Sequence, residues 1–194
     1  MKSIVMDTSN QFLAIALYDE DVQIDKIQVE ALKKQSEWAI PYLQQLLEKH
    51  QWTMYDISQM IISIGPGSYT GVRIALTIAK TLATILPIQI KAISSLALLV
   101  GMNHGLALID ARGHKYYVGY YDRGKALMQD CLMDEETWQA FLMEHKNVLV
   151  YTYQEDIDLC DHLYTLSKLI DPVKDVDGLV PSYIKEVEAK KQCL

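Results

Sequence analysis

The sequence predicts an α/β fold made of two βββαβαβ-type units, the second of them degraded. Short apolar runs rich in β-branched residues alternate with helical patterns along the first half. The glycine turn Gly65-Pro66-Gly67 stands between a strand pattern and a helix pattern, an order typical of α/β sites. The second half then repeats the element order of the first. We therefore expect one subdomain over residues 1–101 and a truncated one over residues 102–194.

The first half contains three strand patterns followed by alternating helices and strands. We expect strands at 3–6, 11–18 and 22–30, a helix at 36–50, a strand at 61–64, a helix from 68 or 69 to 86, a strand at 88–93 and a short helix at 95–102. Ser36 or a near neighbour should cap the first helix, and Pro41 should lie in its first turn or kink it. Ser68 is the expected N-cap of the second helix.

The second half aligns with the first when Asp110 is placed on Asp7. The three strand patterns then recur at one offset, and a helix at 134–145 and a strand at 148–151 follow. Tyr151 is not followed by a glycine turn, and the last helix and strand of this copy look short. We expect a degraded repeat, ending in the polar loop 171–178 and a charged tail at Lys185 to Lys191.

The helix after the glycine turn is apolar over roughly 200° of its circumference, where a surface helix needs about 100°. It carries two apolar rows: Gly71, Ala75, Ala79 and Ala83, and Ile74, Ile78 and Ile85. One side should face its own sheet, and the other should face a second helix or a second protein. The sequence leaves open which row faces the sheet, and whether both rows are internal.

Composition narrows the classes of function. The net charge is -7, which argues against a basic surface for nucleic acid. Cys131, Cys160 and Cys193 are scattered and suggest reduced thiols rather than disulfides or a zinc site. We find no signal-peptide pattern or long apolar span, so we expect a cytoplasmic protein with no membrane association.

Asp7 ends the first strand at the start of a hairpin, and Asp110 is its counterpart. A duplicated RNase H-like unit with such aspartates describes the actin-like (ASKHA) architecture of actin, sugar kinases and Hsp70. In that architecture two hairpins hold nucleotide phosphates and Mg²⁺ across a cleft. The alternative is that each aspartate accepts a hydrogen bond within its own turn.

The glycine turn also has two interpretations. It could hold a phosphate at a helix start, or it could let the helix pack closely. A residual phosphate site would use Asp7, Thr8, Ser9, Gly65, Gly67, Ser68 and Asp110. The turn is neither a Walker A loop nor a nucleophile elbow.

No set of residues in the sequence forms a convincing catalytic or metal-binding group. No two of the five histidines lie three to five residues apart. Ser/His/Asp chemistry cannot be assembled convincingly. We therefore expect no catalytic residue and no metal. The aromatic hairpin tip at Arg112, His114, Tyr116 and Tyr117 is either solvent-exposed or in contact with a ligand or partner.

Several motifs together resemble the TsaB (YeaZ) family. They are Asp7-Thr-Ser9, Gln35-Ser-Glu37 with Pro41, Gly65-Pro-Gly-Ser-Tyr-Thr-Gly-Val-Arg73, Lys80, Asp110-Ala-Arg112 and Pro181-Ser-Tyr183. The resemblance spans the chain, and the Gly65 to Arg73 motif is highly specific. Gln35 departs from the family pattern, which usually has a histidine there, so a role that needs an imidazole at that position loses support.

The resemblance implies an actin-like fold and a non-catalytic, dimerising subunit. Such a subunit belongs to the bacterial machinery that makes N6-threonylcarbamoyladenosine at position 37 of tRNAs reading ANN codons. It implies a catalytic paralogue of the TsaD type, which carries the metal-binding histidine motif, and an ATPase of the TsaE type. Contact with tRNA would come only through the complex. No cofactor is expected, although weak ATP or ADP binding at a partner interface stays open.

Together the apolar helices and the resemblance place a partner interface on the first half. The expected residues are Trp38, Tyr42, Leu46, Gly71, Ile74, Ala75, Ile78, Leu82 and Ile85. The same surface should form a homodimer when the paralogue is absent. Two other functions are alternatives: an ATP-dependent small-molecule kinase, which needs phosphate loops in both halves, and a metallopeptidase, which needs ligands that the sequence lacks.

Overall fold

The computed structural model describes residues 1–31 and 33–184, so the charged tail expected at Lys185 to Lys191 and Cys193 lie outside the described residues. The first unit contains β1 (Lys2–Asp7), β2 (Phe12–Asp19), β3 (Val22–Glu30), α1 (Gln35–Lys49), the 3-10 turn η1 (Met54–Asp56), β4 (Ile57–Ser63), α2 (Gly71–Ile85), β5 (Gln89–Ile93) and α3 (Ser95–Val100). The second contains β6 (His104–Asp110), β7 (Lys115–Asp122), β8 (Lys125–Asp134), α4 (Glu135–Glu144), β9 (Val150–Tyr151) and α5 (Leu159–Ser167).

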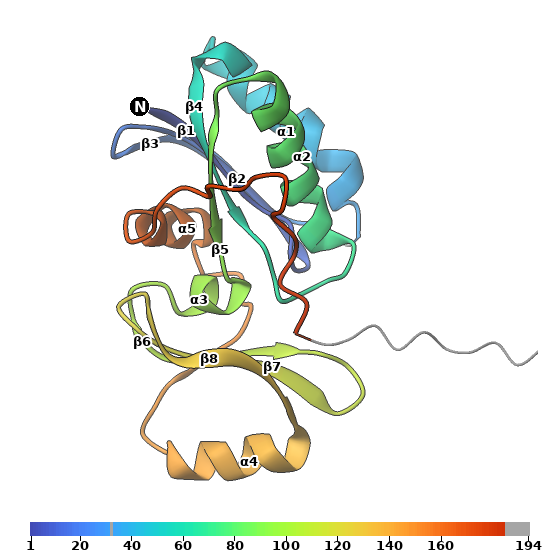
Figure 1. The fold of residues 1–194 in the computed structure, drawn as a ribbon, viewed down its shortest axis with the longest axis vertical. Helices are drawn as coiled ribbons and strands as arrows, with labels where there is room; N and C mark the ends of the chain where they lie inside the picture. Colours follow the sequence, from blue (N-terminus) through green and yellow to red (C-terminus); the bar gives the residue numbers. More distant parts are fainter. Residues whose placement is uncertain (32, 185–194) are drawn as a thin grey trace, which may run out of the picture.

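Two mixed sheets carry the fold, and they lie one above the other in Figure 1. The first has the order β3-β2-β1-β4-β5, and the second has the order β8-β7-β6-β9. In each sheet the first strand pairs antiparallel with the second and parallel with the fourth. The repeated order predicted from sequence is therefore confirmed. The predicted register is wrong by one residue, because Met6 pairs with Ile15 whereas Ile109 pairs with Tyr117 instead of Val118.

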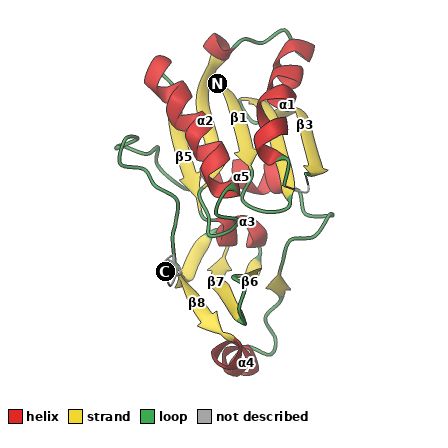
Figure 2. Cartoon of the chain, turned by 90° about the vertical axis from the view of Figure 1, so that its right-hand side faces the viewer, coloured by secondary structure: helices red, strands yellow, loops and turns green. Residues whose placement is uncertain are grey.

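Helices cover both faces of the first sheet. α1 and α2 lie on one face, and α5 lies on the other (Figures 1 and 2). α3 packs against α5 and against β6 and β7, so a buried apolar cluster joins the two sheets. α4 covers the outer face of the second sheet, with Trp138 as its buried anchor. No helix in the described part of the chain is long and apolar enough to cross a membrane.

The expectations about the starts of α1 and α2 need correction. α1 begins at Gln35 after Lys34, whose side chain makes no capping bond, so Ser36 is inside the helix; Pro41 lies in the second turn. α2 begins at Gly71, later than expected, although the Ser68 hydroxyl still accepts a bond from the Gly71 amide at 3.3 Å. The last elements of the second copy are short, as predicted: α5 has 9 residues where α2 has 15, and no strand follows α5 among the described residues.

The segment 171–184 returns to the first unit and runs along the edge strand β5 and along α2 (Figure 1). The Val173 amide donates to the Ile90 carbonyl, and the Ser182 amide donates to the Ile64 carbonyl, both at 2.8 Å. Lys80 donates to the carbonyls of residues 177 and 179 at 2.8 and 3.1 Å. These bonds cover the sheet edge, which would otherwise expose unpaired backbone groups. The expected boundary between residues 101 and 102 stays a prediction.

Arg73 fixes the end of this returning segment. Its guanidinium carbon lies 3.6 Å from the centre of the Tyr69 ring, and its Nε donates to the Tyr183 hydroxyl at 2.8 Å. A cation over an aromatic face is attracted by the ring quadrupole. Residues from the glycine motif and from the Pro181-Ser-Tyr183 motif therefore meet in space, although more than a hundred positions separate them.

Candidate functional site

The outer face of α2 is apolar, and the structure decides which row forms it. Ala75 and Ala79 are fully buried against the sheet, whereas Ile74 and Ile78 are half-buried and Ile85 is 70% exposed. Small side chains allow the helix to approach the strands closely, so the small-residue row faces inward. Ile78 and Ile85 are therefore left on the outside, where a second surface can cover them, whereas Ile74 lines the cleft between the two units.

α1 lies beside α2 and contributes the second half of this face. Trp38 and Tyr42 are half-buried, with ring centroids 5.8 Å apart, and neither of them lines the space between α1 and α2. Leu46 is 2% exposed and belongs to the core. Of the expected interface residues, Leu46, Gly71 and Ala75 thus lie inside the subunit and not on its outer surface.

A groove of about 470 Å³ runs between the two helices. Its lining consists of Ile40, Leu43, Gln44, Leu47, Met54, Thr77, Ile78, Thr81 and Leu82. Ile40 is 51% exposed in this groove and was not among the residues we expected at the interface. Its spacing of three and seven residues from Leu43 and Leu47 on one helix could have indicated it. We call this set of residues the helix-pair groove.

Asp7 lies at the end of β1 and is fully buried. Its carboxylate accepts hydrogen bonds from the Ser9 amide, the Asn10 side-chain amide and the Ser63 hydroxyl. Burial raises the pKa of the Asp7 carboxyl, and these hydrogen bonds oppose the rise. The geometry matches the turn-capping interpretation, because the carboxylate is turned inward toward donors of its own subunit.

The glycine turn packs directly on the Asp7 hairpin. A Cβ at Gly67 would overlap the Ser9 carbonyl oxygen, and the Ser68 amide donates to that same oxygen at 2.8 Å. Thr8 reaches into the start of α2, where its hydroxyl donates to the Gly71 carbonyl at 2.7 Å and accepts from the Ala75 amide at 3.1 Å. Thus the turn lets the helix pack closely, and the Ser68 amide is not free to hold a phosphate.

Asp110, the counterpart of Asp7, is exposed at the end of β6. Its Oδ1 accepts from the Arg112 amide at 2.7 Å, which is the hydrogen bond of an Asx turn. The two aspartates therefore have different environments, one sealed and one at the surface.

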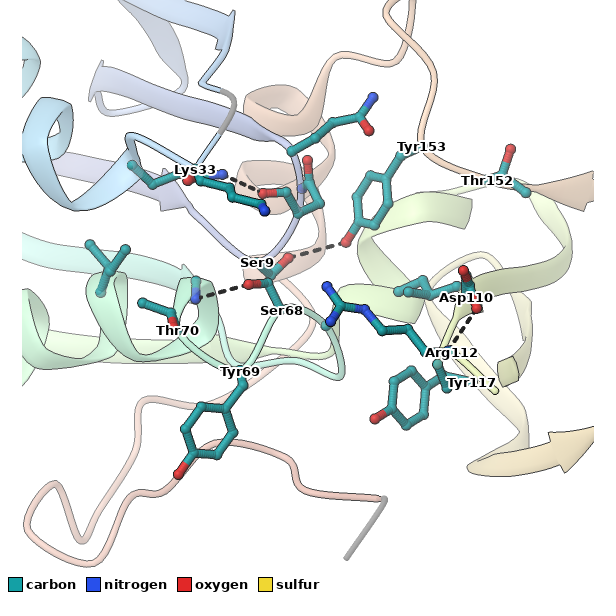
Figure 3. Close-up of a pocket in the computed structure, with 18 of the residues that line it drawn as sticks. Ser9, Lys33, Ser68, Tyr69, Thr70, Asp110, Arg112, Tyr117, Thr152 and Tyr153 are labelled. Carbon is teal, nitrogen blue, oxygen red and sulfur yellow. Dashed lines mark hydrogen bonds between the residues drawn. The ribbon is translucent and has the colours of Figure 1, made fainter. Parts of the chain in front are cut away.

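A cleft of about 1200 Å³ lies between the two units, as Figure 3 shows. Tyr153 projects into it from the segment after β9, where the first unit has its glycine turn. Its hydroxyl lies 3.1 Å from the Ser9 hydroxyl. Burial raises the pKa of Tyr153, and the nearby Asp7 adds to this rise. Tyr153 therefore closes the corner of the cleft next to Asp7. Of the expected phosphate-site residues, Ser9, Gly67, Ser68 and Asp110 line the cleft, while Asp7, Thr8 and Gly65 do not.

Fold and site together define an actin-like protein of the duplicated RNase H-like type, with a sealed aspartate corner and an apolar helix pair on its outer face. Residues 29–147 match the family model of TsaD, described as tRNA N6-adenosine threonylcarbamoyltransferase. The tRNA threonylcarbamoyladenosine biosynthesis protein TsaB of Bacillus subtilis (strain 168) is 33% identical, covering 98% of this chain and 96% of that protein. The chain belongs to the TsaB (YeaZ) family.

Two further comparisons agree with this assignment. TsaB of Escherichia coli (strain K12) is 27% identical over 63% of this chain and 56% of its own length. The solved structure of YeaZ from Pseudomonas aeruginosa superposes with a TM-score of 0.76 at 18% identity. That superposition covers 94% of this chain and 99% of the solved one, and at this identity it supports the fold alone.

Proposed function

We propose that this chain is a non-catalytic subunit of the machinery that forms N6-threonylcarbamoyladenosine at position 37 of ANN-decoding tRNAs. Family membership supports the pathway, since relatives from two bacteria are named as tRNA threonylcarbamoyladenosine biosynthesis proteins. The observation that carries the subunit role is the helix-pair groove, an apolar face left uncovered on the outside of α1 and α2.

The non-catalytic part of the proposal follows from the cleft. A kinase of the actin-like type needs phosphate contacts from both units, yet Tyr153 stands where a second phosphate turn would lie. Asp7 is sealed by three donors and has no surface from which to reach Mg²⁺. These features support a partner subunit over the kinase, and we propose no cofactor at the Asp7 corner. Among the described residues no cluster of three or more histidine, cysteine or acidic side chains could hold a metal.

The partner that we propose is the catalytic paralogue of the TsaD type. Ile78, Leu82 and Ile85 would pack against the equivalent helix pair of the paralogue, giving a four-helix contact across two proteins. The helix-pair groove is self-complementary in chemistry, so two copies of this chain would form a homodimer through the same face when the paralogue is absent. Weak nucleotide binding could occur only where such an interface supplies further contacts. An ATPase of the TsaE type would join the assembly, and the tRNA would bind through the complex. This chain has a net charge of -7, so it would itself make few contacts with tRNA phosphates.

Reconstitution tests this proposal. Threonylcarbamoyladenosine formation on tRNA is measured with the paralogue, the ATPase and the activated threonylcarbamoyl donor, with and without this chain. We expect the modified nucleoside to form only when the chain is present. The isolated chain should show no ATP hydrolysis, kinase or peptidase turnover above background. Robust ATP hydrolysis that is lost in Asp7→Asn would overturn the non-catalytic assignment, and full modification without the chain would overturn the subunit role.

A further inference from the structure

The start of α2 carries an arginine that two tyrosine side chains hold in place. The Arg73 guanidinium carbon lies 3.6 Å from the centre of the Tyr69 ring and 5.5 Å from the centre of the Tyr183 ring. The two rings are 6.1 Å apart, and these tyrosines are 52% and 46% exposed. We call the three residues the Arg73 cluster. It presents a positive charge at the surface in a fixed position.

The cluster restricts Arg73 before any partner binds. A mobile arginine side chain loses conformational entropy when a contact orders it. Stacking on Tyr69 and the hydrogen bond from Nε to the Tyr183 hydroxyl already order Arg73, so binding costs less. That hydrogen bond uses one of the five N–H donors of the guanidinium. The terminal nitrogens can therefore hold a carboxylate through two parallel hydrogen bonds.

No carboxylate among the described residues neutralises this charge. None lies within 4.0 Å of the Arg73 nitrogens. Lys80, seven residues further along α2, also binds neutral groups, the carbonyls of residues 177 and 179. This side of α2 is thus locally positive in a chain whose net charge is -7. An acidic group brought to Arg73 would complement that local charge.

The Arg73 cluster adjoins the helix-pair groove. Thr77 lies one turn after Arg73 on α2 and lines the groove. Arg73 does not line the cleft between the two units, and Figure 3 shows the Tyr69 ring extending from the glycine motif away from Ser9. A protein that covers the groove would therefore meet Arg73 at the N-terminal end of the same helix.

We propose that the paralogue that covers the helix-pair groove places an aspartate or glutamate carboxylate against Arg73. This inference rests on the proposed function, because it adds a charged contact to the same interface. Tyrosine and arginine are enriched in protein interfaces, where a few such residues contribute most of the binding energy. A tRNA phosphate can also bind arginine, but the net charge of -7 and the apolar groove beside Arg73 favour a protein.

Titration calorimetry of the full chain with the paralogue, in the absence of tRNA, tests this proposal. Arg73→Gln removes the charge. Arg123→Gln is the matched control, because Arg123 lies in the hairpin between β7 and β8, on the second sheet and away from α2. We expect Arg73→Gln to weaken pairing by about tenfold or more and Arg123→Gln to leave it unchanged. The loss should shrink between about 50 mM and about 500 mM salt, because salt screens exposed charge pairs.

Arg73→Lys separates the charged contact from the role of Arg73 in holding Tyr183. Lysine keeps the charge but cannot form two parallel hydrogen bonds, so its affinity should lie between those of the wild type and Arg73→Gln. Circular dichroism shows whether each variant is folded. If Arg73→Gln does not fold, the folded lysine variant becomes the test, and wild-type affinity of that variant would overturn the proposal.

The sequence beyond Ile184 contains Glu186 and Glu188, so the effect of Arg73→Gln is also measured in a chain that ends at Ile184. The loss of affinity should persist there if the carboxylate belongs to the paralogue. The proposal is overturned if the loss disappears in the shortened chain, if it appears only when tRNA is added, or if Arg73→Gln pairs like the wild type. A wild-type chain that did not pair with the paralogue would instead refute the proposed function, and this contact with it.

Discussion

Ile78→Glu is the sharpest test of the helix-pair groove. Ile78 is half-buried on the outer row of α2 and lines the groove together with Leu82 and Ile40. In the free chain a glutamate here can turn its carboxylate to water, at a cost of about 1 kcal/mol in lost apolar burial. That cost is small beside a typical stability of about 5–15 kcal/mol, so the variant should fold.

The same substitution is far more costly in the complex. When the partner protein covers the groove, the glutamate carboxylate would leave water without gaining a hydrogen-bond donor or a cation. The complex would also lack the contacts that the isoleucine side chain makes. Together these losses amount to about 4 kcal/mol, which weakens a micromolar complex by about a thousandfold. Sedimentation velocity with and without the paralogue measures the effect. The matched control is Met143→Glu, since Met143 is 66% exposed on α4, away from the groove.

We expect Ile78→Glu to be folded and monomeric in both experiments, while Met143→Glu pairs like the wild type. A folded Ile78→Glu chain that still pairs normally would refute the placement of the interface. If Ile78→Glu unfolds, Ile85→Glu replaces it as the test, because Ile85 is 70% exposed and contributes little to the core. Normal pairing of Ile85→Glu would then refute the placement.

Two further predictions concern stability. Lys49 and His50 donate hydrogen bonds to Asp25 and lower the pKa of its carboxyl to about 2. The unfolded chain has a higher pKa at this position, of about 4, so the unfolded state takes up the proton first as the pH falls. The stabilisation is therefore fully present above about pH 4 and is lost toward pH 2. Asp25→Asn should therefore lower the free energy of unfolding by about 1 kcal/mol at neutral pH. In urea unfolding measured at several pH values, the variant should lose less stability between about pH 4 and about pH 2 than the wild type. An unchanged loss over that range would contradict the pairing. Gly67→Ala should lower the free energy of unfolding by about 2 kcal/mol or more, because the new Cβ would meet the rigid Ser9 carbonyl. The control is Gly113→Ala, which has open space around the new Cβ but a φ of 68° and should cost about 1 kcal/mol. Equal losses of stability in thermal unfolding would argue against the close packing of the glycine turn.

Sequence alone was sufficient for the elements whose signal is local. The alternation in Val22–Glu30 and the apolar run before Gly65 predicted strands that the structure contains. The repeat of Asp7 at Asp110 gave the order of the second unit, because a duplicated unit preserves the succession of elements. The Gly65 to Arg73 motif indicated the family from sequence alone. Each of these signals resides in neighbouring residues or in their spacing.

The tertiary structure decided everything that depends on distant neighbours. Periodicity showed two apolar rows on α2, but only packing against the sheet determined that Ala75 faces inward and Ile78 outward. Asp7 and Asp110 look alike in sequence, yet one is sealed by Ser63 and Asn10 and the other is exposed. The corner of the cleft next to Asp7 is closed by Tyr153, which lies 144 positions from Ser9 in the chain. Local sequence fixes backbone preference, whereas burial and charge environment arise from contacts between segments far apart in the chain.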